Sequence, residues 1–148
     1  MKRRTLLQTL PVVTLFPKAL MAGSREQTTS AGSIPTTVYE LRVYHTYEGK
    51  LGDLLRRFRE HTMALFERHG IKNVAYWTPL DEPAKGNTLI YILEHPSREA
   101  AAANWKAFQE DAEWKSVRDK SEANGKIVEK VDSTFMALTD FSRKIEAS

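Results

Sequence analysis

Apolar and polar positions alternate in the first regular stretch of the chain, residues 37–45. A period of two, with β-branched and aromatic residues in excess, predicts a strand. One face would carry Tyr39, Leu41 and Val43, and the other would carry Glu40, Arg42 and Tyr44. From Leu51 to Phe66 the apolar residues recur every three or four positions, which predicts an amphipathic helix that ends at Gly70. Its arginines, Arg57 among them, are expected to face water.

Two further strands are predicted, one on each side of a turn. Residues 71–78 and 88–94 are rich in β-branched and aromatic side chains, and residues 79–87 between them contain Asp, Glu, Pro, Lys and Gly. The later stretch is apolar on both faces. This composition favours a place in the centre of a sheet, where both faces are covered.

Two capped helical segments and a last strand complete the pattern. Ser97 and Asp111 are placed to cap successive helices, because their side-chain oxygens accept hydrogen bonds from the first free backbone amides. Residues 126–138 supply a fourth strand. The order βαββαβ predicts a ferredoxin-like α+β fold, an antiparallel-rich four-stranded sheet with helices on one face. We expect the strands at 37–45 and 88–94 to lie parallel in its middle.

The sheet face without helices needs a cover of its own. We expect it to carry Tyr44, Ile90 and Ile92, which form too large an apolar patch to leave in water. A homodimer that pairs sheet against sheet would bury this patch. The alternative is a monomer whose open face holds a ligand.

The N-terminus resembles an export signal. Arg3-Arg4-Thr5 precedes an uncharged, mostly apolar run to Phe16, which is too short to span a bilayer. The arginine pair resembles a twin-arginine motif, so we predict a signal peptide over residues 1–24 and a periplasmic or secreted product. A general-secretion signal or an uncleaved anchor are the alternatives. A polar linker at 25–36, the folded domain at 37–141 and a C-terminal tail at 142–148 would follow.

The predicted leader changes what the charge of the chain implies. The chain has 22 Lys and Arg against 19 Asp and Glu, and four of the bases, but no acid, lie in residues 1–24. The remainder then has 18 bases against 19 acids, a balance that does not favour nucleic-acid binding. The chain has no cysteine, which excludes disulfides, thiolate nucleophiles and Cys-ligated zinc.

An ordered set of short motifs resembles the NIPSNAP family of the dimeric α+β-barrel superfamily. The motifs are Tyr39-Glu40-Leu41-Arg42-x-Tyr44, Gly49-Lys50-Leu51, Arg68-His69-Gly70, Tyr76-Trp77-Thr78, Asn87, Ser97-Arg98-Glu99-Ala100 and Asp111-Ala112-Glu113-Trp114. Ala112 departs from the proline that is common there. The resemblance implies a dimer of ferredoxin-like subunits whose sheets form a barrel, and it implies no agreed activity.

Four residues are candidates for binding a small molecule: Glu40, Arg42, Tyr44 and Trp77. Glu40 and Arg42 share a strand face, which we expect to point away from the helices and toward the barrel interior. There the two charges would anchor the polar head of a ligand. The alternative is an ion pair, within the subunit or across the dimer, that only supports assembly.

Among the four histidines, His61 is the candidate acid–base residue. It lies at the margin of the first helix's apolar stripe, where it could reach a cavity, and a histidine side chain is the usual choice for proton transfer near neutral pH. We expect His45 and His95 to approach each other at one end of the sheet. No histidine has metal-ligand spacing, so we predict no metal site and no cofactor.

These observations leave three functions open. The first is an exported ligand-binding or assembly protein without catalysis. The second is a small cofactor-independent oxidoreductase, monooxygenase-like, or an isomerase that uses His61, Arg42 and Tyr44. The third is a haem binder, because the twin-arginine route carries folded, cofactor-loaded proteins.

Overall fold

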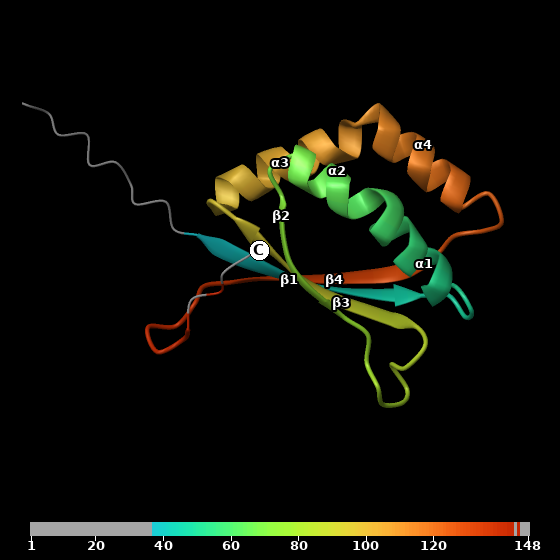
Figure 1. Ribbon diagram of the computed structural model, residues 1–148, viewed down its shortest axis with the longest axis horizontal. Helices are drawn as coiled ribbons and strands as arrows, with labels where there is room; N and C mark the ends of the chain where they lie inside the picture. Colours follow the sequence, from blue (N-terminus) through green and yellow to red (C-terminus); the bar gives the residue numbers. More distant parts are fainter. Residues whose placement is uncertain (1–36, 144, 146–148) are drawn as a thin grey trace, which may run out of the picture. The chain divides into compact units, whose positions relative to one another are not determined.

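The computed structural model describes residues 37–143 and 145. The predicted leader at 1–24 and linker at 25–36 lie outside the described residues. The elements follow the order of the prediction (Figure 1). They are β1 Val38–Thr46, α1 Leu51–Arg57, η1 Phe58–Thr62, α2 Met63–Arg68, β2 Lys72–Trp77, β3 Thr88–His95, α3 Arg98–Glu110, α4 Ala112–Ser121 and β4 Val128–Met136.

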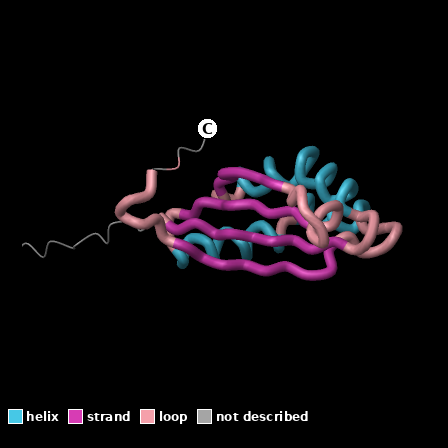
Figure 2. Tube along the Cα trace, turned by 90° about the horizontal axis from the view of Figure 1, so that it is seen from below, coloured by secondary structure: helices cyan, strands magenta, loops and turns pink. Residues whose placement is uncertain are grey.

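The strands form one sheet in the order β2-β3-β1-β4, and the helices cover one of its faces (Figures 1 and 2). The predicted ferredoxin-like α+β fold and the central place of β3 are therefore confirmed. β1 pairs antiparallel with both β3 and β4, so the expectation of parallel central strands was wrong. The physical reason is the turn at 78–87, which reverses the chain between β2 and β3. The helical crossover makes β1 parallel to β2 instead, two places away in the sheet.

The antiparallel register separates two histidines that were expected to meet. His45 lies opposite Thr88, and His95 lies opposite Val38. The two histidines therefore stand at opposite ends of the β1–β3 pair, and the expected approach between them was wrong.

Local capping chemistry begins and ends the helices where the sequence indicated. Ser97 accepts a hydrogen bond from Ala100 N, and Asp111 accepts from Glu113 N and Trp114 N, so both predicted N-caps are confirmed. Gly70 follows α2 with a φ of +70°, which glycine adopts without the cost a side chain would add. A Cβ at this position would also meet Asn104 Nδ2 at 3.0 Å.

The long helix predicted from Leu51 contains a π-helical turn, η1, between α1 and α2. Met63 N donates to Phe58 O across this turn, and Thr62 Oγ1 donates to Arg57 O at 3.2 Å. A π turn inserts one residue into the helical repeat and so shifts the apolar face of the helix partway along its length. Phe58 and Thr62 are buried, as their places on the predicted apolar stripe indicate, whereas His61 is exposed.

The hydrophobic core lies between the sheet and the helix layer. Its centre is formed by Leu54, Phe58, Leu65, Phe66, Ile71, Leu89, Tyr91, Leu93, Phe108 and Ile127. On β1 the residues that point into this layer are Glu40, Arg42 and Tyr44, which lie opposite Leu93, Tyr91 and Leu89 of β3. The prediction that Glu40 and Arg42 point away from the helices was therefore wrong, although their shared face was right.

The uncovered face of the sheet, which is turned toward the viewer in Figure 2, carries apolar residues at its centre. It carries Leu41 and Val43 of β1 and Ile90 and Ile92 of β3, which cross-strand pairing places side by side. Trp77 of β2 lies opposite Ile90 and is 49% exposed. The expected apolar patch is present, with one correction: Tyr44 belongs to the helix-facing side, where its ring meets Phe58.

Candidate functional site

A buried carboxylate organises the covered face of β1. Glu40 is 1% exposed. Its Oε1 accepts from Arg42 Nη1 and Ser133 Oγ, each at 2.7 Å. Its Oε2 accepts from Trp105 Nε1 at 2.7 Å and from His95 Nε2 at 3.0 Å. Burial alone would raise the pKa of Glu40, but the hydrogen bonds from His95, Ser133 and Trp105 and the charge of Arg42 lower it to about 2.

Arg42 completes this network from the same strand. Its Nε donates to Tyr91 Oη at 3.0 Å and its Nη2 to Tyr44 Oη at 3.3 Å, while its guanidinium lies 4.3 Å from the Trp105 ring centroid. Burial alone would lower the pKa of Arg42, but the neighbouring tyrosines and Glu40 raise it. Because both oxygens of Glu40 accept two hydrogen bonds each and the guanidinium of Arg42 donates to three side chains, the geometry matches the structural alternative, in which the two charges satisfy each other.

An aromatic cluster surrounds the network and fills the space beside it. Tyr91 is fully buried, and its ring lies 5.1 Å from Tyr76, 5.2 Å from Phe58 and 5.3 Å from Tyr44 between centroids. Burial raises the pKa of Tyr91 well above its usual range. Tyr91 therefore remains neutral at any physiological pH.

The structure thus brings together three of the four residues predicted to bind a ligand. Glu40, Arg42 and Tyr44 form one buried network, whereas Trp77 lies on the opposite, uncovered face of the sheet. A single pocket cannot use all four. The parity of β2 indicates why, since Tyr76 faces the core and its neighbour Trp77 must face away.

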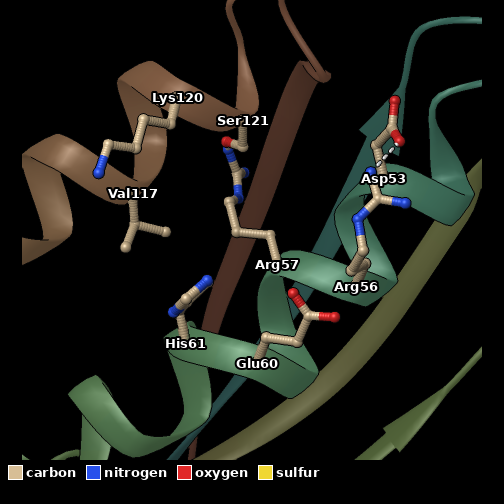
Figure 3. Close-up of a pocket in the computed structure, with 8 residues that line it drawn as sticks. All are labelled: Asp53, Arg56, Arg57, Glu60, His61, Val117, Lys120 and Ser121. Carbon is tan, nitrogen blue, oxygen red and sulfur yellow. Dashed lines mark hydrogen bonds and ion pairs between the residues drawn. The ribbon is translucent and has the colours of Figure 1, made fainter.

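His61, the candidate acid–base residue, lines a hollow of about 320 Å³ between the α1–η1 segment and α4 (Figure 3). The other lining residues are Asp53, Arg56, Arg57, Glu60, Val117, Lys120 and Ser121. Neither Arg42 nor Tyr44 lines this hollow. His61 is therefore separated from its two predicted catalytic partners, and its neighbours are residues that the sequence pattern did not single out.

Arg57 forms the buried side of this hollow, although it was predicted to face water. It is 5% exposed, and its Nη1 donates to Ser121 Oγ at 3.1 Å and to Glu122 Oε1 at 3.2 Å. Its Nε is buried and has no hydrogen-bond partner among the described residues. An unsatisfied buried donor costs about 1–3 kcal/mol. The helical periodicity placed Arg57 outside because it does not reveal that α4 packs over this turn.

Some of the remaining charged residues of the hollow form ion pairs and others do not. Arg56 Nη2 donates to Asp53 Oδ1 at 2.6 Å, and Lys50 Nζ lies 3.6 Å from Asp53 Oδ2. Lys120 and Glu60 take part in no ion pair within the part of the chain that the structure describes. The hollow therefore presents cationic groups from both of its walls, and one of its two carboxylates is already paired.

A second hollow of about 280 Å³ lies beside the aromatic cluster. It is lined by Leu55, Phe58, Arg59, Met63, Tyr76 and Leu89. Its walls are almost entirely apolar, so it offers shape but few groups that could orient a ligand. The hollow next to His61 has the richer chemistry of the two.

The other histidines are engaged in pairs. His69 Nε2 lies 2.7 Å from Asp111 Oδ2, and His45 Nε2 lies 3.0 Å from Asp132 Oδ2. His95 is fully buried against Glu40, and its Nδ1 has no partner among the described residues. Within residues 37–143, no three His, Asp or Glu side chains gather as a metal site would require. No helix in the same range has the length and apolar character of a membrane span.

Comparison with known families and structures places this geometry in context. A family model described as NIPSNAP matches residues 39–143. A NIPSNAP-like domain protein from Burkholderia xenovorans is 13% identical, with a TM-score of 0.65 over 76% of this chain and 94% of that chain. A search of curated proteins gave no match.

Two further solved structures share the fold at low identity. A dimeric ferredoxin-like protein from an uncultured marine organism is 16% identical, with a TM-score of 0.50 over 73% of this chain and 92% of that chain. A monooxygenase from Streptomyces coelicolor, crystallised with nanaomycin D, is 11% identical, with a TM-score of 0.53 over 76% of this chain and 96% of that chain. The fold that they share with this chain is ferredoxin-like.

Proposed function

The chain belongs to the NIPSNAP family, and on this premise we propose that it is an exported homodimer that binds a small molecule in each subunit. The assembly surface is the uncovered face of the sheet. The ligand site is the hollow between the α1–η1 segment and α4. The N-terminal arginine pair supports export, to the periplasm or beyond.

The apolar centre of the uncovered sheet face is the observation that carries this proposal. Leu41, Val43, Ile90 and Ile92 adjoin one another there with Trp77 beside them. Charged pairs stand at its margin, between Lys72 and Glu94 and between His45 and Asp132. An apolar centre with a polar rim is the anatomy of a protein interface. A second copy of the same face is self-complementary, as twofold symmetry requires.

Light scattering on the mature chain, begun at Arg25, tests the assembly. We expect a dimer mass at micromolar concentration. Ile92→Glu places a charge at the centre of the proposed interface and should shift the mass to that of a monomer. Ala107→Glu adds the same charge on the outer surface of α3, where the side chain is exposed, and should leave the dimer intact. A monomer mass for the unaltered chain would refute the assembly.

A second candidate function, proton transfer, is favoured by the place of His61. Its exposed imidazole shares a hollow with the guanidinium of Arg57. A base beside a cation is an arrangement that can remove a proton from a bound molecule and return it, as an isomerase does. A cofactor-independent oxidoreductase of the monooxygenase kind would also need dioxygen, and no contact among the described residues singles out that step.

Deuterium exchange distinguishes binding from proton transfer. A ligand bound in heavy water should gain deuterium at carbon only if the site removes its proton, which NMR detects directly. His61→Asn should then abolish the exchange without abolishing binding. Binding without any exchange would leave the protein a binder and remove the isomerase alternative.

A further inference from the structure

We propose that the hollow beside His61 binds a small monocarboxylate, and that the Nη2 group of Arg57, which makes no hydrogen bond with the described residues, holds its carboxylate. This inference rests on the proposed function, since it takes that hollow as the ligand site. It adds the chemical class of the ligand and the residue that selects it.

The buried guanidinium of Arg57 supplies the first argument. A guanidinium carries five N–H donors in a rigid plane. Ser121 and Glu122 occupy Nη1, which holds the plane in one orientation without using Nη2. Nε is fully enclosed, so a ligand in the hollow cannot reach it. Nη2 makes no hydrogen bond with the described residues and is not fully enclosed, so its N–H groups can donate to the oxygens of a carboxylate.

The rim of the hollow supplies the second argument. Lys120 of α4 and His61 of η1 line it together with Arg57 (Figure 3). Lys120 makes no ion pair within the described residues, so its ammonium group is free to approach an anion that Arg57 holds. Val117 adds an apolar wall between them. An anion with a short apolar body matches these three contacts.

The acidic residues nearby limit the charge of the ligand. Glu122 forms an ion pair with Arg57, with Oε1 3.2 Å from Nη1, and Asp53 forms an ion pair with Arg56. Glu60 also lines the hollow and repels further negative charge. The acidic and basic residues around the hollow together favour a ligand with one negative charge over a ligand with two. A carboxylate meets this condition better than a phosphate does. A volume of about 320 Å³ lies at the lower end of ligand pockets, which suits a small molecule.

Titration calorimetry with a matched set of probes tests this assignment. Butyrate and benzoate should bind, whereas butyramide, butylamine and inorganic phosphate should bind more weakly. Arg57→Lys keeps the charge but removes the Nη2 donors, and should weaken carboxylate binding about tenfold, as expected for lost charge-assisted hydrogen bonds. Lys120→Gln should weaken it less. Lys115→Gln removes a charge from the same helix outside the hollow and should have no effect.

A spectroscopic readout keeps the test independent of folding defects. The Nε–H signal of Arg57 in ¹H–¹⁵N spectra of the unaltered protein, assigned by its loss in Arg57→Lys, should shift on saturation with butyrate. A signal that stays in place while butyrate binds would overturn the role of Arg57. If butyramide bound as well as butyrate, the carboxylate assignment would fail while the small-molecule-binding proposal stood. No binding by any probe to an intact dimer would overturn both.

Discussion

Replacing the buried carboxylate of Glu40 by an amide is the sharpest test of the network on β1. Glu40→Gln keeps the size of the side chain but removes its charge. Arg42 would then lose its counter-charge in a buried site, and Gln would present an NH₂ group where the carboxylate accepts two hydrogen bonds. Breaking a buried ion pair in this way costs about 3–5 kcal/mol of folding free energy.

The pH dependence of stability gives a second, independent value for the contribution of the ionised Glu40 to the free energy of unfolding. The pKa of Glu40 falls from its ordinary 4.5 to about 2 in the folded protein. Because one pKa unit corresponds to about 1.4 kcal/mol, the ionised group stabilises the fold by about 3 kcal/mol. The sign follows from the lowered pKa. This stabilisation is complete above pH 4.5, the unfolded value, and is lost as the pH falls toward about 2.

Urea unfolding of the unaltered protein and of Glu40→Gln, from pH 7 to pH 2, measures both effects. The difference in unfolding free energy should be constant above pH 5 and should shrink by about 3 kcal/mol between pH 5 and pH 2. Glu129→Gln, at an exposed strand position, controls for the loss of one surface charge. If Glu40→Gln does not fold, ¹³C NMR titration of the Glu40 carboxyl in the unaltered protein gives its pKa directly. Parallel unfolding profiles, or a Glu40 carboxyl that titrates near 4.5, would refute the network as described.

Two further predictions concern a helix cap and the leader. Ser97→Ala removes the acceptor for Ala100 N and should lower the unfolding free energy, measured by urea titration, by about 1 kcal/mol. Ser116→Ala, at an exposed position of α4, should change the unfolding free energy little. Equal losses in the two variants would contradict the capping role of Ser97. If the twin-arginine route is used, replacing Arg3 and Arg4 together by lysine should keep the precursor in the cytoplasm. Cell fractionation and blotting measure where the variant accumulates. Normal export of this variant would indicate the general secretion route instead.

The element order and the helix starts were predictable because they depend on local patterns. Ser97 and Asp111 cap their helices through backbone amides two or three residues away, so the signal lies within a few positions of each residue. The central place of β3 also followed, because residues 89–93 are apolar on both faces of the strand, a composition typical of strands inside a sheet.

Contacts between distant elements were not predictable in the same way. Arg57 is buried because α4, more than fifty positions later, packs over it and supplies Ser121 and Glu122. The π turn at Phe58–Thr62 also leaves no mark in the sequence, because the apolar positions from Leu51 to Phe66 are typical of one regular helix. The site around His61 therefore became visible only when the two helices were placed side by side.

The two faces of β1 explain the most instructive error. We expected Glu40 and Arg42 to point away from the helices, toward the interior of a barrel, yet they face the helix layer, and Leu41 and Val43 lie on the uncovered face. A strand can carry its charges inward only if they satisfy one another, as Glu40 and Arg42 do with His95, Ser133 and Trp105. It can carry aliphatic residues outward only if something covers them. The proposed dimer meets this second condition, because it turns the uncovered face into an interior. The inverted pattern is therefore what a subunit buried on both sides of its sheet requires.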